Sequence, residues 1–87
     1  MMTPETAFPE YDFTFQVLST HFEPCSLTVK FTPVDTRLTA TEVRVPLDAT
    51  FDPANLKPYL AKYAPNRRWF GQLVLLEHGE ALVGKEG

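Results

Sequence analysis

The chain has 87 residues, a formal net charge of −3 and one cysteine, Cys25. This length fits a single domain over residues 1–87, and one cysteine excludes an internal disulfide. The acidic balance argues against nucleic-acid binding, which depends on neutralising phosphates with Lys and Arg. Two histidines beside that cysteine are too few for an ordinary zinc site. We therefore expect no metal and no other cofactor.

The apolar residues are numerous enough to fold but are not arranged to cross a membrane. They make up 44% of the chain, which excludes wholesale disorder. The longest apolar run, Leu73–Leu76, is far shorter than the ~20 residues that span a bilayer. The N-terminal sequence MMTPETAFPEYD has no basic start and no apolar h-region of a secretory signal. We expect no membrane insertion, and a protein of the cytoplasm or of a particle assembled there.

Residues 1–12 form a proline-containing segment in which Phe8 and Tyr11 lie among Pro4 and Pro9. The segment is too apolar for a free tail and too irregular for a core element. We therefore predict an extended N-terminal arm that lies on a neighbouring subunit.

Three segments downstream alternate apolar and polar residues with the period of two that marks half-buried strands. They are Asp12–Thr20, Cys25–Thr32 and Thr41–Leu47. In the first of them, Phe13, Phe15 and Val17 share one face. The regular alternation and the short links between the segments indicate an antiparallel sheet with one face in water.

A short helix is predicted over about residues 55–63. The spacing i, i+3, i+4, i+7 relates Leu56, Tyr59, Leu60 and Tyr63. Pro58 would break a helix begun at Pro53, so two alternatives remain open. Either residues 53–56 form a separate tight turn, or Asn55 caps a later helix that holds Pro58 in its first turn. In both cases Ala64-Pro65 ends the helix.

Residues 67–77, RRWFGQLVLLE, fit either a buried strand or a helical face. The neighbours Pro65, Asn66 and Gly71 disfavour a helix, so we predict a fourth extended segment here. A sheet with one apolar face must bury that face against another element, here the predicted helix. The expected fold is therefore α+β, with an antiparallel sheet of three to four strands and one short helix.

Positive charge is concentrated in the segment 56–70, which carries four bases and no acid. Aromatic side chains interleave with these bases, and Tyr, Trp and Arg are enriched at interface centres. We therefore predict a protein interface at this segment and at the arm. Its expected residues are Tyr59, Tyr63, Arg67, Arg68, Trp69, Phe8 and Tyr11. Two alternatives stay open: a site for nucleic acid or another anion, and a solvated pair of arginines beside a core tryptophan.

No catalytic constellation is apparent. His21 and Cys25 lie four residues apart across a predicted turn, with no third residue to orient them. Asp48 and Asp52 lack the spacing of a calcium loop and fit turn and cap roles. We therefore predict that the chain is not an enzyme and has no catalytic residues.

The order of features over about residues 31–69 carries a resemblance. It consists of F-T-P-x-D-x-x-L-T at Phe31–Thr39, D-x-x-N-L-x-x-Y-L-x-x-Y-A-P at Asp52–Pro65, and Trp69. This pattern resembles small bacteriophage-encoded proteins whose genes lie among virion and tail genes. The resemblance implies a non-enzymatic structural component of a phage particle, near the tail, baseplate or fibres.

Such a component would be assembled in the host bacterial cytoplasm, in several symmetric copies or as a homo-oligomer, with other protein subunits as partners. The alternative is a small phage-encoded effector or assembly chaperone that binds a host or phage protein and stays outside the particle.

Overall fold

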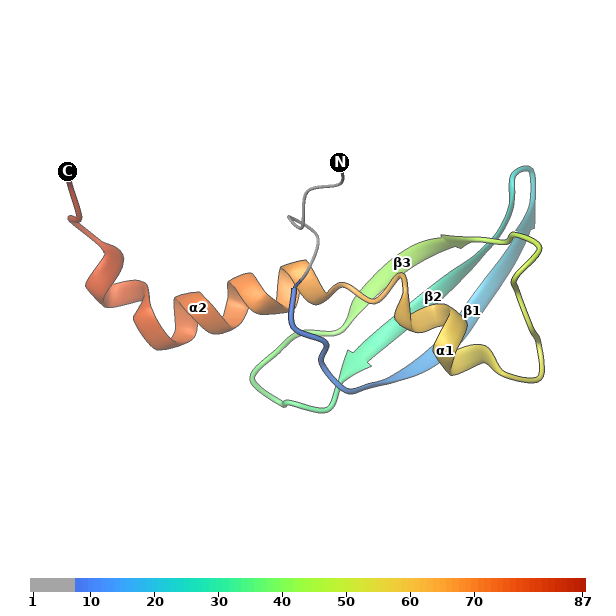
Figure 1. Ribbon diagram of the computed structural model, residues 1–87, viewed down its shortest axis with the longest axis horizontal. Helices are drawn as coiled ribbons and strands as arrows, with labels where there is room; N and C mark the ends of the chain where they lie inside the picture. The colour runs from blue at the N-terminus through green and yellow to red at the C-terminus, as the bar shows by residue number, and fades with distance from the viewer. Residues whose placement is uncertain (1–7) are drawn as a thin grey trace.

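The computed structural model describes residues 8–87. It shows a three-stranded antiparallel sheet followed by two helices (Figure 1), which confirms the predicted α+β class. The elements are β1 (Phe13–Phe22), β2 (Cys25–Pro33), β3 (Thr41–Pro46), α1 (Leu56–Ala61) and α2 (Asn66–Leu82).

The three predicted strands are confirmed, and they form a meander in the order β1-β2-β3. Phe15 pairs with Phe31 of β2, and Val29 of β2 pairs with Val43 of β3. A bulge lies between Val17 and Ser19, so the register shifts beyond it. The outer end of the β1–β2 hairpin has little cover, because β1 is exposed over residues 16–20 and again at its last residue, 22.

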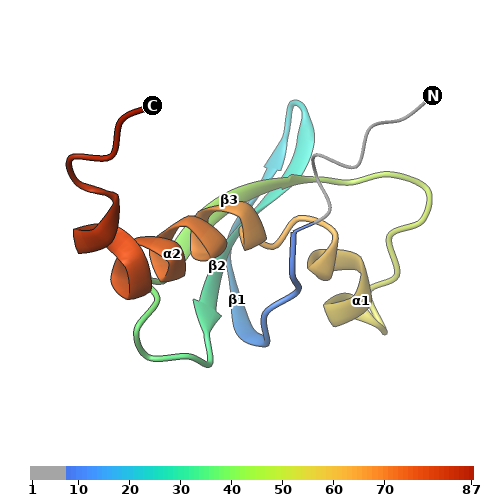
Figure 2. The same cartoon turned by 60° about the vertical axis from the view of Figure 1, so that its left-hand side comes forward.

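The core lies on one face of the sheet, where α1 and the first turns of α2 cover it (Figure 2). The middle strand contributes most, since Leu27, Val29 and Phe31 alternate into this face and are buried. The other buried apolar residues are Phe13, Leu38, Val45, Tyr59, Leu60 and Trp69.

Helix α1 begins where the second alternative for Pro58 places it. The helix starts at Leu56, so Pro58 lies in the first turn; Asn55 occupies the N-cap position, but its side chain makes no capping hydrogen bond. An amide there has no intrahelical partner, and a proline costs nothing in hydrogen bonding. A tight turn precedes the helix, closed by the bond from the Asn55 N–H to the Asp52 carbonyl at 3.0 Å. The predicted short helix is thus confirmed.

The predicted fourth extended segment is wrong, because residues 66–82 form the 17-residue helix α2. Pro65 stands at the N-cap and its carbonyl accepts the Trp69 N–H at 3.0 Å. A helix places Trp69 and Leu73, four residues apart, together against the core. Gly71 is no obstacle, since its backbone is ordinary and it costs a helix only about 1 kcal/mol.

Helix α2 extends past the body it packs on. Its first turns lie beside the sheet, and its C-terminal part continues beyond the sheet into open space (Figure 1). The described residues therefore form an elongated molecule with extents of 48 × 36 × 22 Å.

Candidate protein-interaction surface

Trp69 joins α2 to the sheet. Its side chain is fully buried, and its indole N–H donates to the Thr39 carbonyl at 2.9 Å. The edge of the Tyr11 ring lies against it, with 6.4 Å between centroids. Trp69 is therefore a core residue that anchors the helix, as the alternative interpretation required, and it is removed from the interface set.

Tyr59 is also a core residue. Its hydroxyl donates to the Pro46 carbonyl at 2.5 Å and accepts the Asp48 N–H at 3.2 Å. Its ring packs edge-on against Phe51 and at a tilt against the half-buried Tyr63. Burial raises the pKa of the Tyr59 phenol. These contacts fasten the segment after β3 to α1 and leave Tyr59 no surface for a partner.

Replacing Tyr59 with phenylalanine is expected to lower the free energy of unfolding by about 1–3 kcal/mol, because the Pro46 carbonyl and the Asp48 N–H lose their partner. Urea denaturation followed by circular dichroism measures the change. Tyr11→Phe is the matched control, since the Tyr11 hydroxyl makes no hydrogen bond within residues 8–87. Equal stabilities for the two variants would contradict the role assigned to the Tyr59 hydroxyl.

Two of the four bases in the segment 56–70, Lys57 and Lys62, contact other side chains of the same chain. The Lys57 ammonium lies 4.9 Å from the Phe13 ring centroid and 3.2 Å from the Asp12 carboxylate. The Lys62 ammonium lies 4.5 Å from the Tyr59 ring centroid. The Lys57 contact lowers the pKa of Asp12. The two lysines therefore lie over aromatic rings of the chain itself, although both remain exposed to solvent.

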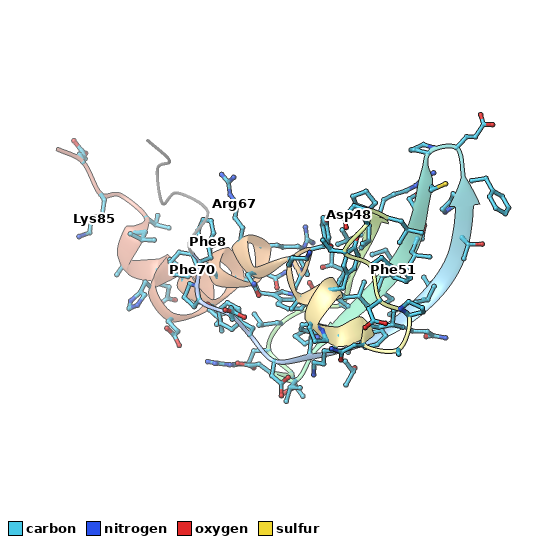
Figure 3. All side chains as sticks on the ribbon, turned by 45° about the vertical axis from the view of Figure 1, so that its right-hand side comes forward. Phe8, Asp48, Phe51, Arg67, Phe70 and Lys85 are labelled. Atoms are coloured by element: carbon cyan, nitrogen blue, oxygen red, sulfur yellow. The ribbon has the colours of Figure 1, made fainter. Side chains whose placement is uncertain are left out.

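The described part of the arm lies along its own α2. Phe8 packs against Phe70 with 5.6 Å between ring centroids, and the Arg67 guanidinium lies 5.9 Å from the Phe8 ring (Figure 3). The Tyr11 N–H donates to the Asn66 side chain at 3.4 Å. Phe8 and Tyr11 are thus packed within one chain, whereas the arm was predicted to lie on a neighbour. The rest of the arm, residues 1–7, lies outside the described residues.

The loop after β2 holds the middle of α2. The Gln72 amide donates to the Thr39 hydroxyl at 2.7 Å, and Arg37 reaches Glu77 at 3.5 Å. Arg37 also pairs with Asp35 at 2.8 Å, which lowers the pKa of that carboxyl to about 2. Within residues 8–87, no hydrogen bond or ion pair connects the stretch 78–87 to another element. The contacts that dock α2 therefore end at Glu77.

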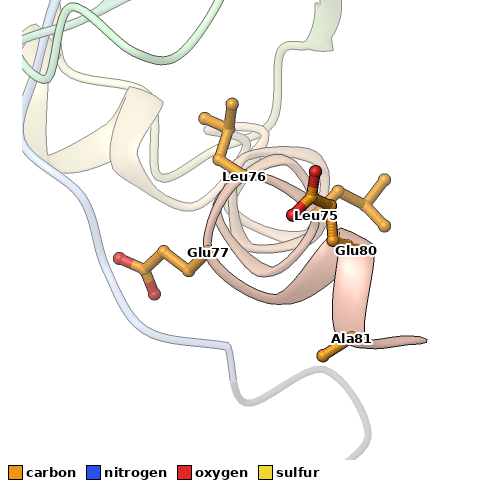
Figure 4. Close-up of a pocket in the computed structure, with 6 residues that line it drawn as sticks. Leu75, Leu76, Glu77, Glu80 and Ala81 are labelled. Atoms are coloured by element: carbon orange, nitrogen blue, oxygen red, sulfur yellow. The ribbon is translucent and has the colours of Figure 1, made fainter. Parts of the chain in front are cut away.

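Just before Glu77 and after it, the chain carries large apolar side chains in solvent, three of them in α2 and one, Val83, at its C-cap. The exposed fraction is 66% for Leu75, 59% for Leu76, 45% for Leu82 and 83% for Val83. We call these four residues the apolar end of α2. Figure 4 shows Leu75 and Leu76 pointing outward from the helix beside an open depression that Gly79 and Ala81 also line. A second depression joins Leu75 and Leu76 to Arg37 and Gln72.

Comparison of the chain with protein-family models, curated proteins and solved structures found no match.

The structure does not bring His21 and Cys25 together. His21 bonds to Thr28 at 2.9 Å, whereas Cys25, one residue after the turn, projects to the opposite face of the sheet. Among the described residues, no three His, Cys, Asp or Glu side chains gather as metal ligands. In the same part of the chain, neither helix has the length and apolarity needed to span a bilayer.

The apolar end of α2 was not among the residues that sequence reasoning selected. Its signal was present in the run Leu73–Leu76 and in Leu82-Val83. In a helix, successive side chains point in different directions around the axis, so these residues cannot all face one core. Of the predicted set, Arg67 and Arg68 remain exposed and Tyr63 is half-buried.

Proposed function

We propose that this chain is a non-enzymatic structural or assembly protein that binds another protein subunit through the apolar end of α2. The observation that supports it is the projection of this stretch beyond the sheet with its leucines uncovered. Contiguous exposed apolar surface with a polar rim marks interaction sites in soluble proteins.

The residues around the apolar end have the composition of an interface. Large aliphatic side chains form its centre, and Arg68, Glu77, His78 and Glu80 stand around them. Fully burying one such aliphatic side chain contributes about 1.5–3 kcal/mol. Side chains that are already partly covered contribute less, and the total must also exceed the free-energy cost of association.

The setting we propose is a phage particle, with the chain a minor component of the tail, baseplate or fibre region. This part of the proposal is supported by the resemblance carried by Phe31–Thr39, Asp52–Pro65 and Trp69. Phage particles are built from repeated subunit contacts, and a small α+β body with a projecting apolar helix suits such a contact. Its partners are protein subunits, and the acidic chain does not favour nucleic acid.

Photo-crosslinking in cells tests the contact. A photoreactive phenylalanine analogue is placed at Leu76, and in a separate variant at Val34, which is 57% exposed on the loop after β2. We expect a discrete crosslinked protein species from position 76 and none from position 34. Adding Leu75→Gln and Val83→Gln should abolish the species while circular dichroism remains unchanged. Equal crosslinking at both positions, or none at 76, would overturn the proposal.

A further inference from the structure

We infer that the outer edge of β1 binds a second copy of this chain, which adds its own β1 antiparallel and joins the two sheets about a two-fold axis near Phe15. The inference goes beyond the proposed function and does not depend on it, because β1 and the apolar end of α2 are different elements. Three features carry it: the open backbone groups of β1, the absence of charge along the strand, and its match to itself when paired antiparallel.

The backbone of β1 has one open side. Because β1 is an outer strand, its residues bond to β2 only alternately. The Val34 N–H donates to the Asp12 carbonyl at 3.1 Å, and this pair continues the register of β1 and β2. The alternation therefore directs the peptide groups of Phe13, Phe15 and Val17 away from β2. Among the residues that the structure describes, no hydrogen bond from outside the sheet reaches the backbone of Phe15 or Val17.

The two edges of the sheet differ in the features that normally prevent strand addition. Short length, charged side chains and proline protect an exposed edge. The edge strand β3 has all three, since it is six residues long, carries Glu42 and Arg44, and ends at Pro46. The edge strand β1 is ten residues long and contains no proline and no Asp, Glu, Lys or Arg. The edge of β1 is therefore the one suited to accept another strand.

The bulge between Val17 and Ser19 limits how far such pairing extends. Before the bulge, the odd-numbered residues direct their peptide groups outward, and beyond it the shifted register directs the even-numbered ones outward. A regular partner strand can follow only one of these stretches. We place the contact on Phe13–Val17, because Phe15 there packs against the core and extends the apolar layer to the edge.

A second β1 pairs with this stretch reciprocally, as a two-fold interface must. With the axis near Phe15, the Phe15 peptide groups of the two copies face each other, and the Val17 N–H of each faces the Phe13 carbonyl of the other. On the apolar face, Phe15 lies opposite Phe15 and Val17 opposite Phe13. On the polar face, Thr14 lies opposite Gln16. Aromatic and β-branched pairs stabilise a sheet, and no like charges oppose each other.

A second copy supplies the strand that this edge requires. That strand must be extended and must alternate apolar with polar residues in phase with β1, so that it extends both faces of the sheet. β1 meets this requirement, and pairing it with itself removes two open edges at once. Oligomerisation is also a common source of stability in small domains. The described part of the arm does not run along the edge, because it leaves the start of β1 toward α2, where Phe8 packs on Phe70 (Figure 1).

Sedimentation velocity of the purified full chain over a concentration series tests the pairing. We expect a monomer–dimer equilibrium. Thr14→Lys/Gln16→Lys should weaken the dimer by about 10-fold or more, because it sets lysines of the two copies opposite each other. Thr20→Lys/Phe22→Lys is the matched control, since both residues are exposed on the same strand but lie beyond the bulge. It should leave the dissociation constant unchanged. A chain that is monomeric at every concentration, or a dimer that responds equally to both variants, would overturn the inference.

A charge exchange tests whether β1 pairs with β1. Thr14→Glu/Gln16→Glu should dimerise weakly alone and should form a tight heterodimer when mixed with Thr14→Lys/Gln16→Lys. If mixing restores no affinity, β1 contacts a different surface and the assignment is wrong. Circular dichroism should show the wild-type spectrum for each variant, because Thr14 and Gln16 are exposed.

Failure of this inference is distinguishable from failure of the proposed function. Leu75→Glu should leave the β1 dimer unchanged, and a dimer weakened by it but not by Thr14→Lys/Gln16→Lys would contradict pairing through β1. If the chain is monomeric while position 76 crosslinks to another protein in cells, the β1 pairing is wrong and the proposed function stands. If the dimer forms through β1 and position 76 crosslinks to nothing, only the proposed function is overturned.

Discussion

Replacement of Trp69 by alanine is expected to lower the free energy of unfolding by about 3–5 kcal/mol. The side chain is fully buried between α2 and the sheet, so its removal leaves a large cavity. The Thr39 carbonyl also loses its hydrogen bond from the indole N–H. Because domains of this size are stable by only about 5–15 kcal/mol, the loss is a large share of the total.

Urea denaturation monitored by far-ultraviolet circular dichroism measures this effect, and thermal melting should show a fall of about 4–8 °C per kcal/mol. Arg68→Ala is the matched control, since Arg68 is the next residue along α2 and is exposed. It should change stability by less than about 0.5 kcal/mol. A Trp69→Ala variant as stable as that control would show that α2 is not anchored here.

Phe31→Ala is expected to cost about 3–5 kcal/mol as well, for a different structural reason. Phe31 lies in the middle strand, is fully buried, and pairs across the sheet with Phe15 and Thr41. Its ring meets Phe13 edge-on, with 5.2 Å between centroids. Truncation removes the residue that connects both outer strands to the apolar layer.

The same denaturation experiment reports this change, with Phe22→Ala as control. Both substitutions remove a phenylalanine ring from the β1–β2 hairpin, but Phe22 is 89% exposed. The Phe22 variant should be nearly as stable as the wild type. If the two variants lost equal stability, the apolar layer would not be centred on β2.

The two kinds of variant separate folding from assembly. Trp69→Ala and Phe31→Ala act through the core, so they should lower the unfolding free energy of the monomer itself. Leu75→Glu acts at an exposed position, so it should leave the chain folded while weakening the proposed contact with a partner subunit. A loss of monomer stability in Leu75→Glu would place Leu75 in the core and contradict its exposure.

The sheet was predictable because its information is local. Alternation places Leu27, Val29 and Phe31 on one face whatever the rest of the chain does. The short helix was predictable for the same reason, since the spacing of Leu56, Tyr59 and Leu60 already describes a helical face. Even Pro58 limited the start of that helix to two alternatives, because a proline is tolerated in the first turn.

Helix α2 was not predictable to the same degree. The run Leu73–Leu76 satisfies a buried strand and a helix equally well, and periodicity cannot separate them. Local propensity pointed away from a helix at Gly71, and tertiary packing overrode it by placing Trp69 and Leu73 together against the core. The aromatic and basic residues of the predicted interface looked alike in sequence, although Trp69 is buried and Arg68 is exposed.

The sequence by itself determined the α+β class, the three strands, the short helix and the concentration of positive charge before residue 70. The tertiary structure decided which apolar residues are core and which are surface. Leu82 and Val83 are exposed because α2 continues past the end of the sheet. Leu75 and Leu76 are exposed because of their direction, since they lie between the docked Gln72 and Glu77 but point outward from the helix. Periodicity describes the faces of a helix, but it does not say where the body under that helix stops.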